Sequence, residues 1–512
     1  MNSTPLILKY FISCFKYVSS GYLTTKYTLK VLVFLSIISL ISCQNKTNTG
    51  LDNNSNSTRP NIVLILADDL GYGDLSCYGQ QKFSTPNIDN LARNGIKFLN
   101  HYAGSTVCAP SRSTLMTGLH TGHTPIRGNV PTSGPKRWSL PDSTRTLSKL
   151  LEEQGYKSGI FGKWGLGQLN TSAEPLNQGF KRFFGYIGHW NSHLHYPPYL
   201  YSNRKKIKLK ENLNHGKGKY APDEIHKKAL KFIEKHKDST FFLYFPTTLP
   251  HAELAAPDDI MQKYLGKYGK EKLFLGADSN QGKSWSNYNS QENPKAAFAA
   301  MMNILDTHVG EIVDKLKEHD LIENTIIIFT SDNGPHNEGG AEPWYFNSNG
   351  ELRGIKRELN EGGIKVPLIV NWGNKIKKGS KTDHICANYD FFPTFMEMLG
   401  LGENSNLDGI SFLPTLLGKS QKKHEYLYWE FHEKGGIQAV RLGKWKGIRL
   451  KMSKDQNAPI RLLNLNSDPK EKKNLALKHP EIVSKIDRIM KHEHKMTEDF
   501  RFGFEQPVST EK

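Results

Sequence analysis

Asn61-Ile62-Val63-Leu64-Ile65-Leu66-Ala67-Asp68-Asp69 is the stretch that says most about the fold of this chain. A short apolar run that stops abruptly at charged residues is typical of a strand buried on both faces, as in a parallel sheet. Four later runs have the same character, and we expect all five to be strands of one parallel sheet. The later runs are residues 159–161, 241–245, 325–329 and 367–370.

Helical patterns alternate with these runs. Residues 143–154 place Leu147, Leu150 and Leu151 on one face of a helix, and residues 296–319 form a longer amphipathic pattern. Alternating strands and helices predict an α/β fold in which helices cover both faces of the sheet.

The pattern changes at about residue 420. Short alternating runs separated by glycine turns predict a small antiparallel sheet, followed by a helix. The runs are residues 426–431, 436–441, 445–449 and 461–465, and the helix is predicted over 480–494. We therefore expect a catalytic domain over residues 59–420 and a sheet-plus-helix subdomain over 421–512.

Polar residues with chemical potential follow four of the predicted strands. Asp68 and Asp69 follow the first, and Lys163 follows the next. His251 lies just beyond the third, and Asp332-Asn333 follows the fourth. Because the carboxyl ends of parallel strands build the ligand crevice of an open α/β sheet, we expect these groups to converge on one pocket.

The segment Cys108-Ala109-Pro110-Ser111-Arg112 resembles the active-site signature of the type I sulfatases. In that family the cysteine is oxidised to formylglycine, whose hydrated aldehyde attacks sulfur with one hydroxyl and later expels sulfate with the other. The resemblance extends in order over about residues 59–500 and implies an alkaline-phosphatase-like mixed sheet. Pro110 can begin a helix, which would place residue 108 at an anion-favouring helix N-terminus. The alternative is that Cys108 is a small buried apolar residue.

Residues 67–74 resemble the N-terminal metal motif of the same family. Adjacent carboxylates are costly to bury without compensation, and a divalent cation is the natural one. An all-oxygen set favours Ca²⁺, with Mg²⁺ as the alternative, over zinc. The metal ligands that the resemblance implies are Asp68, Asp69, Cys108 as formylglycine, Asp332 and Asn333. Taken singly, each of these segments could instead be a tight turn.

Residues 161–167 resemble the family motif G-K-W-H-L-G with one departure, because the usual His is Gly165. In the family that His contacts the formylglycine diol and assists sulfate release. Lys163 matches the motif and would bind sulfate oxygens. The loop of residues 188–197 carries His189, His193 and His195, and we predict that His193 supplies the missing function. A His in such a loop could equally be an ordinary surface residue.

Three further residues complete the resemblance. Leu249-Pro250-His251 matches a motif whose His protonates the leaving alcohol. Residues 352–367 match the R-G-x-K and E-G-G-x-x-V-P segment and place Lys356 on the sulfate-binding lysine. Arg112 would hold the hydrated aldehyde and the metal-site oxygens. Residues 338–350 resemble a branch of carbohydrate sulfatases that act on galactose-type residues.

The first 42 residues contain no Asp or Glu and end in the apolar run 31–40. This run is short for a membrane span but suits a signal peptide. Leu40-Ile41-Ser42-Cys43 resembles a bacterial lipobox, so we expect a signal peptide over 1–42, a lipid anchor at Cys43 and a flexible tether over 43–58. The protein would then be exported and attached to a bacterial membrane through this lipid alone. Ordinary signal cleavage beside an incidental cysteine is the alternative.

Charge and cysteine content limit the partners. The net charge of +18 favours anionic partners, although a generally lysine-rich composition explains part of it. We see no nucleic-acid-binding module and expect a sulfated polysaccharide or oligosaccharide instead. Cys77 and Cys386 are the cysteines left without an assigned role, so we expect two buried thiols, with one bridge as the alternative.

The sequence thus predicts hydrolysis of sulfate esters on a saccharide, either a sulfated galactan or a glycan containing galactose or N-acetylgalactosamine. A formylglycine-generating enzyme would be a partner during maturation. One alternative is a phosphodiesterase or phosphonate hydrolase of the same superfamily. Another is a non-catalytic lipoprotein that captures glycans, since Gly165 replaces a catalytic residue.

Overall fold

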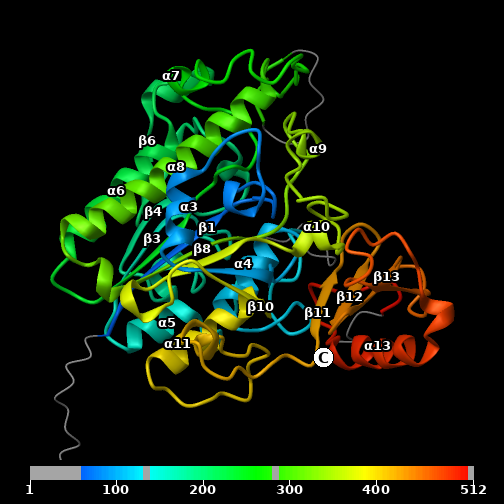
Figure 1. The fold of residues 1–512 in the computed structure, drawn as a ribbon. Coiled ribbons are helices and arrows are strands. Elements are labelled where there is room, and N and C mark those ends of the chain that lie inside the picture. Colours follow the sequence, from blue (N-terminus) through cyan, green and yellow to red (C-terminus); the bar gives the residue numbers. More distant parts are fainter. Residues whose placement is uncertain (1–58, 131–138, 280–287, 506–512) are drawn as a thin grey trace, which may run out of the picture. The chain divides into compact units, whose positions relative to one another are not determined.

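A computed structural model describes residues 59–130, 139–279 and 288–505 (Figure 1). The predicted signal peptide, the lipid site Cys43 and the tether all lie outside these residues. No helix within the described ranges has the length and apolar character that a membrane crossing requires.

A mixed sheet of ten strands forms the centre of the molecule, in the order β10-β2-β9-β8-β1-β7-β3-β4-β5-β6. The neighbours β8, β1, β7 and β3 run parallel to one another. This confirms the predicted α/β class with a mixed sheet. The strands are β1 (Asn61–Ala67), β2 (Ile96–Tyr102), β3 (Lys157–Lys163), β4 (Arg182–Tyr186), β5 (Tyr199–Ser202), β6 (Lys205–Lys208), β7 (Phe241–Pro246), β8 (Thr325–Ser331), β9 (Leu368–Asn371) and β10 (Ser380–Ala387).

The predicted direction of one strand is wrong. Residues 367–370 were expected to be parallel, but β9 is antiparallel to both β8 and β2. Leu368 at the start of β9 pairs with Thr330 near the end of β8. The chain leaves β8 at its carboxyl end, forms the loops and short helices of residues 332–367, and re-enters at the same edge. A connection that returns without crossing the sheet produces an antiparallel neighbour.

Helices cover both faces of this sheet (Figure 1). Along β1, Val63, Ile65 and Ala67 pack with α3, α6 and α8, while the residues between them pack with α4, α5, α11 and α12. Side chains of a strand alternate between faces, so an unbroken apolar run is what a strand covered on both sides requires. The helices are α3 (Pro86–Arg93), α4 (Cys108–Thr117), α5 (Leu147–Glu153), α6 (Ala221–Lys235), α7 (Asp258–Met261), α8 (Pro294–Glu318), α9 (Pro343–Phe346), α10 (Glu361–Ile364), α11 (Phe391–Met398) and α12 (Leu413–Leu416).

The C-terminal part forms the predicted small antiparallel sheet with one helix. The sheet has the order β11-β12-β13-β14, and α13 (Pro480–Glu493) packs on one of its faces. Its opposite face packs on Tyr102, Val107, Leu359 and Ile364 of the main sheet region. The strands are β11 (Leu427–Phe431), β12 (Ile437–Leu442), β13 (Trp445–Leu450) and β14 (Ile460–Asn464).

Buried polar contacts join this small sheet to the segments that carry the candidate site. Trp429 donates to the Ala103 carbonyl at 2.9 Å, and Lys446 donates to Glu361 at 2.8 Å. Val107, which caps α4, belongs to the same apolar cluster as Trp429. The small sheet therefore supports the segments on which residues 108 and 356 lie.

A second polar cluster lies at the outer end of β11. His494 donates from Nδ1 to Glu430 at 2.7 Å and contacts Glu505 through Nε2 at 2.6 Å. Arg127 donates to the other oxygen of Glu430 at 3.0 Å. This cluster, which we call the His494 clasp, ties β11 to the segment after α13.

The three described cysteines are free thiols. Cys386 is buried and Cys77 is half-buried, so the predicted unbridged pair is confirmed, although only Cys386 is fully enclosed.

Candidate active site

The polar groups that follow β1, β3, β7 and β8 lie close together at the carboxyl ends of these strands. Lys163 Nζ donates to Asp68 Oδ2 at 2.8 Å, which joins the ends of β3 and β1. The Asp69 amide donates to Asp332 Oδ1 at 3.0 Å, which joins the ends of β1 and β8. Asn333 Nδ2 donates to Asp69 Oδ1 at 2.6 Å. These residues are far apart in sequence, and they meet because they follow neighbouring parallel strands.

Cys108 is the first residue of α4 and is only 2% exposed. The helix begins earlier than Pro110 alone indicated, with Val107 as its extended N-cap. Residue 108 therefore lies at a helix N-terminus, where backbone N–H groups and the helix dipole favour anions. Burial raises the pKa of the Cys108 thiol to about 12. An unmodified cysteine is thus a neutral and weak nucleophile here.

Arg112 lies one turn into α4 and faces the carboxylates. Its Nε and Nη2 donate to Asp332 Oδ2 at 3.0 and 2.8 Å, and Nη1 donates to the Lys163 carbonyl at 2.8 Å. Nη2 also lies 3.6 Å from Asp68 Oδ1. The guanidinium thus holds three strand ends in a fixed arrangement.

Lys356 and His251 occupy the other side of the cluster. Lys356 Nζ donates to Asp69 Oδ2 at 2.7 Å and lies 3.1 Å from His251 Nε2. His193 stacks on His251 with a centroid distance of 4.9 Å and an interplanar angle of 12°. All the residues predicted for the site therefore lie together, and His193 joins them through His251.

Charge within the cluster is unevenly shared. Burial would raise the pKa of Asp68, but Lys163 and other neighbouring groups outweigh it and hold that pKa well below its usual range. At Asp332, burial and the Asp68 carboxylate prevail and raise the pKa to about 7. The carboxylates therefore need more positive charge nearby before all of them can ionise at neutral pH.

The donor set fits a divalent cation that prefers oxygen. Asp68, Asp69, Asp332 and Asn333 present carboxylate and amide oxygens, and Asp68 Oδ1 and Asn333 Oδ1 are buried without a hydrogen-bond partner. A buried acceptor without a donor is costly, and a cation would satisfy both oxygens. Asp68, Asp69, Cys108 and His251 also offer atoms within 4.8 Å of one another. His251 Nε2 is engaged by Lys356, which leaves the oxygen set as the ligands.

A family model described as Sulfatase matches residues 60–401, and one described as N-sulphoglucosamine sulphohydrolase, C-terminal, matches residues 354–498. The chain belongs to the sulfatase family. It is therefore a sulfuric ester hydrolase, and its large mixed sheet with a small antiparallel sheet is the alkaline-phosphatase-like fold of that family.

The relatives of this sulfatase include proteins named as carbohydrate sulfatases. An N-acetylgalactosamine-6-O-sulfatase of Bacteroides thetaiotaomicron is 30% identical over 90% of this chain and 98% of its own length. The human N-acetylgalactosamine-6-sulfatase is 30% identical over 70% of this chain and 66% of its own. The crystal structure of Ps i-CgsB in complex with k-i-k-neocarrahexaose superposes with a TM-score of 0.71 at 27% identity, covering 88% of this chain and 96% of that chain.

This sulfatase departs from the family motif at Gly165, where the backbone has a φ of +73°. A Cβ added at Gly165 would lie 2.8 Å from His189 Cε1, and its three nearest atoms would all belong to His189. The space beside residue 165 is thus filled by an imidazole from another segment. His195, the third histidine of the loop, is fully buried.

Four residues around Lys356 were not predicted. Glu338 pairs with Arg357 and lies 3.6 Å from Lys356 Nζ, and Tyr288 donates to Glu338 at 2.8 Å. His336 stacks on His251 at 5.5 Å. Two sequence signals pointed to this region: the resemblance of residues 338–343 to a carbohydrate-sulfatase branch, and the motif of residues 352–367, which contains Arg357.

Proposed function

We propose that this sulfatase hydrolyses sulfate esters on a saccharide, with a galactose or N-acetylgalactosamine residue carrying the sulfate. The observation that carries the proposal is the buried cluster in which Arg112, Lys163 and Lys356 surround the carboxylates beside residue 108. The names of the relatives support the sugar type, because two are named N-acetylgalactosamine-6-sulfatases and one solved structure is a complex with k-i-k-neocarrahexaose.

Asp68, Asp69, Asp332 and Asn333 would hold the divalent cation, with Ca²⁺ preferred to Mg²⁺ for an all-oxygen set. When bound, the cation supplies positive charge against the sulfuryl oxygens. Formylglycine at position 108, completing the ligand set, supplies one hydroxyl for attack on sulfur and a second for release of sulfate. These assignments account for the two buried oxygens without partners and for the unreactive state of the unmodified thiol.

The chain's own cations bind and orient the sulfate group. Lys163 and Lys356 each hold one carboxylate here and stand on opposite sides of the cluster. With these carboxylates held by a cation, the two ammonium groups would be available to bind the sulfuryl oxygens. Arg112 keeps Asp332 in place through two hydrogen bonds. Such preorganised charges stabilise the transition state without reorganisation during reaction.

His251 is proposed to protonate the departing sugar oxygen. Burial and the adjacent Lys356 lower its pKa well below the usual value, so the ring is neutral in the unliganded site. An anionic sulfate ester would raise that pKa, which couples protonation to substrate binding. His193, stacked on His251, keeps the ring in position.

Export and lipid anchoring at Cys43 remain part of the proposal, as does the division at residue 420. They rest on the sequence patterns at 31–43 and 426–494.

The test is release of sulfate from a panel of defined sulfated oligosaccharides. We expect turnover on galactose-type or N-acetylgalactosamine-type sulfates and none on the desulfated sugars. An aryl sulfate and an aryl phosphodiester, assayed side by side, distinguish sulfatase from phosphodiesterase activity. Turnover of the phosphodiester alone would favour the phosphodiesterase alternative.

A further inference from the structure

His189 occupies the place that the missing side chain at position 165 would have used. The chain pairs β3 with β4 and continues the pairing beyond both strands, since the Gly165 amide donates to the Ile187 carbonyl at 3.0 Å. His189 follows two residues later. The Ser192 amide and hydroxyl both donate to its carbonyl, at 3.0 and 2.6 Å, which fixes its backbone. The imidazole of His189, which follows β4, thus lies beside Gly165, where the family motif has a histidine side chain.

The surroundings of His189 are those of the catalytic cluster. Both ring nitrogens of His189 are shielded from solvent, and the ring lies against position 165, two residues after Lys163. Burial and the nearby charges of Lys163 and other groups lower its pKa well below the usual value, so the ring is neutral and able to accept a proton. His193 lies four residues further along and stacks on His251. His189 thus lies against position 165, and His193 lies against His251.

We propose that His189 is the residue that assists sulfate release in this enzyme, in place of a histidine at position 165. His189 takes the proton of the second hydroxyl on residue 108 while the carbonyl re-forms and the carbon–oxygen bond to the departing sulfate breaks. This assignment rests on the proposed formylglycine mechanism. It replaces the prediction for His193, which becomes a residue that positions His251.

The kinetic test compares His189→Ala and His189→Gln with His193→Ala on an aryl sulfate. Both His189 variants should release the alcohol in a burst and then turn over about 10²-fold more slowly than wild type, the usual scale for loss of a general base. Intact-mass measurement should then find enzyme carrying one sulfuryl group. His193→Ala should show no burst and no adduct. An adduct in His193→Ala alone would overturn the assignment in favour of His193.

A double-mutant cycle in thermal stability tests whether His189 occupies the space beside residue 165, and it requires no enzymatic turnover. Gly165→Ala should lower the melting temperature of wild type, because its Cβ meets His189 and the backbone is left-handed. The same change in a His189→Ala background should cost less, because the contact is gone. Equal losses in both backgrounds would contradict the placement of His189. If wild type hydrolyses no sulfate ester, the proposed function fails while this cycle still reports on the placement.

A cavity lies near the starts of β2 and β10, at the other side of the sheet from the strand ends of the candidate active site. It has a volume of about 950 Å³ and is lined by residues 380–385 of β10, by Ile96 at the start of β2, and by residues from the segments 375–377 and 415–424. Since β2 and β10 run in the direction of β1, their starts lie away from the strand ends that form the catalytic cluster.

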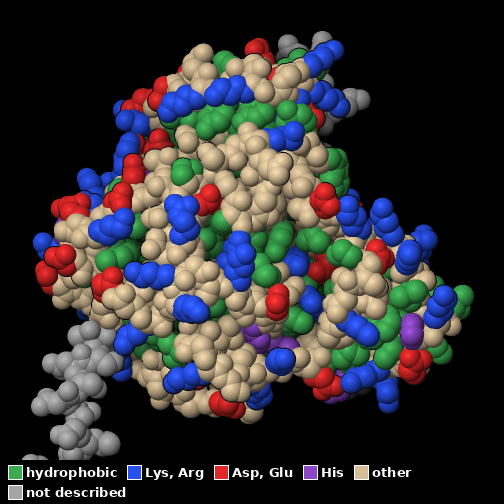
Figure 2. All heavy atoms as spheres, in the orientation of Figure 1, with side chains coloured by type: hydrophobic (Ala, Val, Ile, Leu, Met, Phe, Trp, Pro, Cys, Tyr) green, Lys and Arg blue, Asp and Glu red, His purple; other side chains and the backbone are tan. Residues whose placement is uncertain are grey.

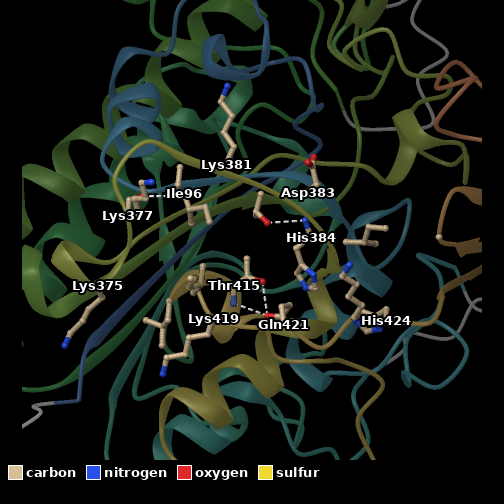
Figure 3. A pocket seen from close by; sticks show the side chains of 18 residues that line it. Ile96, Lys375, Lys377, Lys381, Asp383, His384, Thr415, Lys419, Gln421 and His424 are labelled. Atoms are coloured by element: carbon tan, nitrogen blue, oxygen red, sulfur yellow. Dashed lines mark hydrogen bonds between the residues drawn. The ribbon is translucent and has the colours of Figure 1, made fainter.

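The cavity is strongly basic. Five lysines line it with Asp383 as the one carboxylate among its lining residues, and none of these lysines forms an ion pair within the described ranges. The lysines are Lys375, Lys377, Lys381, Lys419 and Lys423. Figure 3 shows His384 and His424 side by side at one end of the hollow. His384 Nε2 is shielded and has no hydrogen-bond partner. Basic and acidic side chains are interspersed over the visible face of the molecule (Figure 2). The cavity differs in composition, because its lining holds five lysines and one carboxylate.

We propose that this cavity is a second binding site for a sulfated glycan chain, which it would retain while the catalytic site acts on another part of the same polymer. The proposal takes its ligand class from the proposed function. Sulfate groups match unpaired ammonium groups in charge, and binding of several of them makes affinity depend on salt.

Binding is measured with the inactive Cys108→Ala protein, so the result does not depend on turnover. Neutralising Lys375, Lys381 and Lys419 to Gln should weaken binding to carrageenan at least about tenfold and reduce its salt dependence. Hydrolysis of a small aryl sulfate by the otherwise wild-type triple variant should be unchanged. A matched control neutralises Lys227, Lys315 and Lys317, which pair with acids on the surface. Equal carrageenan binding by the two triple variants would overturn the proposal. If free phosphate weakens carrageenan binding as much as the three substitutions do, the cavity is a site for small anions and the proposal is wrong.

Discussion

Replacing His494 by Gln should destabilise the folded enzyme in a strongly pH-dependent way. His494 lies between Glu430 and Glu505, with contacts of 2.7 and 2.6 Å. Burial would lower its pKa, but its hydrogen bonds to the two glutamates prevail and raise the pKa to about 9 from an ordinary value of 6.5. Each unit of pKa shift corresponds to about 1.4 kcal/mol, so the clasp contributes about 3 kcal/mol through this proton.

The sign follows from the direction of the shift. A histidine whose folded pKa is raised stabilises the fold fully below its unfolded pKa and loses that contribution as pH rises through its folded pKa. The difference in free energy of unfolding between wild type and His494→Gln should therefore be largest at pH 6 and below. It should shrink steadily between about pH 6.5 and 9.

Urea unfolding of both proteins at pH 5.5, 7, 8 and 9.5 measures this difference. His492→Gln is the control, because the His492 side chain is 77% exposed and should change little at any pH. Hydrogen exchange of residues 494–505 would report a local opening if the clasp releases before the whole protein unfolds. A difference that stays constant from pH 5.5 to 9.5 would refute the reasoning.

Three further predictions concern catalysis. Cys108→Ala should lower kcat/KM by at least about 10³-fold, and mass analysis of the wild-type peptide should find formylglycine at position 108; undiminished turnover in the variant would exclude the covalent mechanism. Chelation should abolish activity and lower the melting temperature, with Ca²⁺ restoring both better than Zn²⁺ does; full activity after exhaustive metal removal would contradict the site. His251→Ala should slow hydrolysis of sugar sulfates about 10²-fold or more but affect a nitrophenyl sulfate far less, since a good leaving group needs no proton; equal losses on both substrates would argue against a proton-donor role.

The strand-end argument predicted that these polar groups converge, because it depends on geometry that every parallel sheet shares. Asp68, Lys163, His251 and Asp332 are far apart in sequence, yet each follows one of four adjacent strands. The direction of β9 could not be predicted in this way. It depends on where the chain returns after the insertion of residues 332–367, and a strand of four residues reads the same in either direction.

The place of His189 beside Gly165 could not be predicted for a related reason. Its position depends on pairing that continues beyond the ends of β3 and β4, and no periodicity in residues 188–196 indicates it. Strand β5 and the edge strand β6 were also missed. Lys205-Lys206-Ile207-Lys208 is mostly exposed, and the polar residues typical of a protected edge conceal the strand pattern.

The burial of residue 108 sets an order of events in the life of the chain. Cys108 is buried, and the two residues before it contact later parts of the chain: the Arg357 amide donates to the Thr106 carbonyl, and Val107 packs in the apolar cluster of Trp429. These segments are synthesised more than 200 residues after residue 108. If Cys108 is oxidised by another enzyme, that enzyme has to reach it before those segments fold over α4. Maturation and folding would then compete for the same nascent chain. Slower closure of the C-terminal half would yield a larger active fraction, and rapid closure would leave well-folded molecules permanently inert.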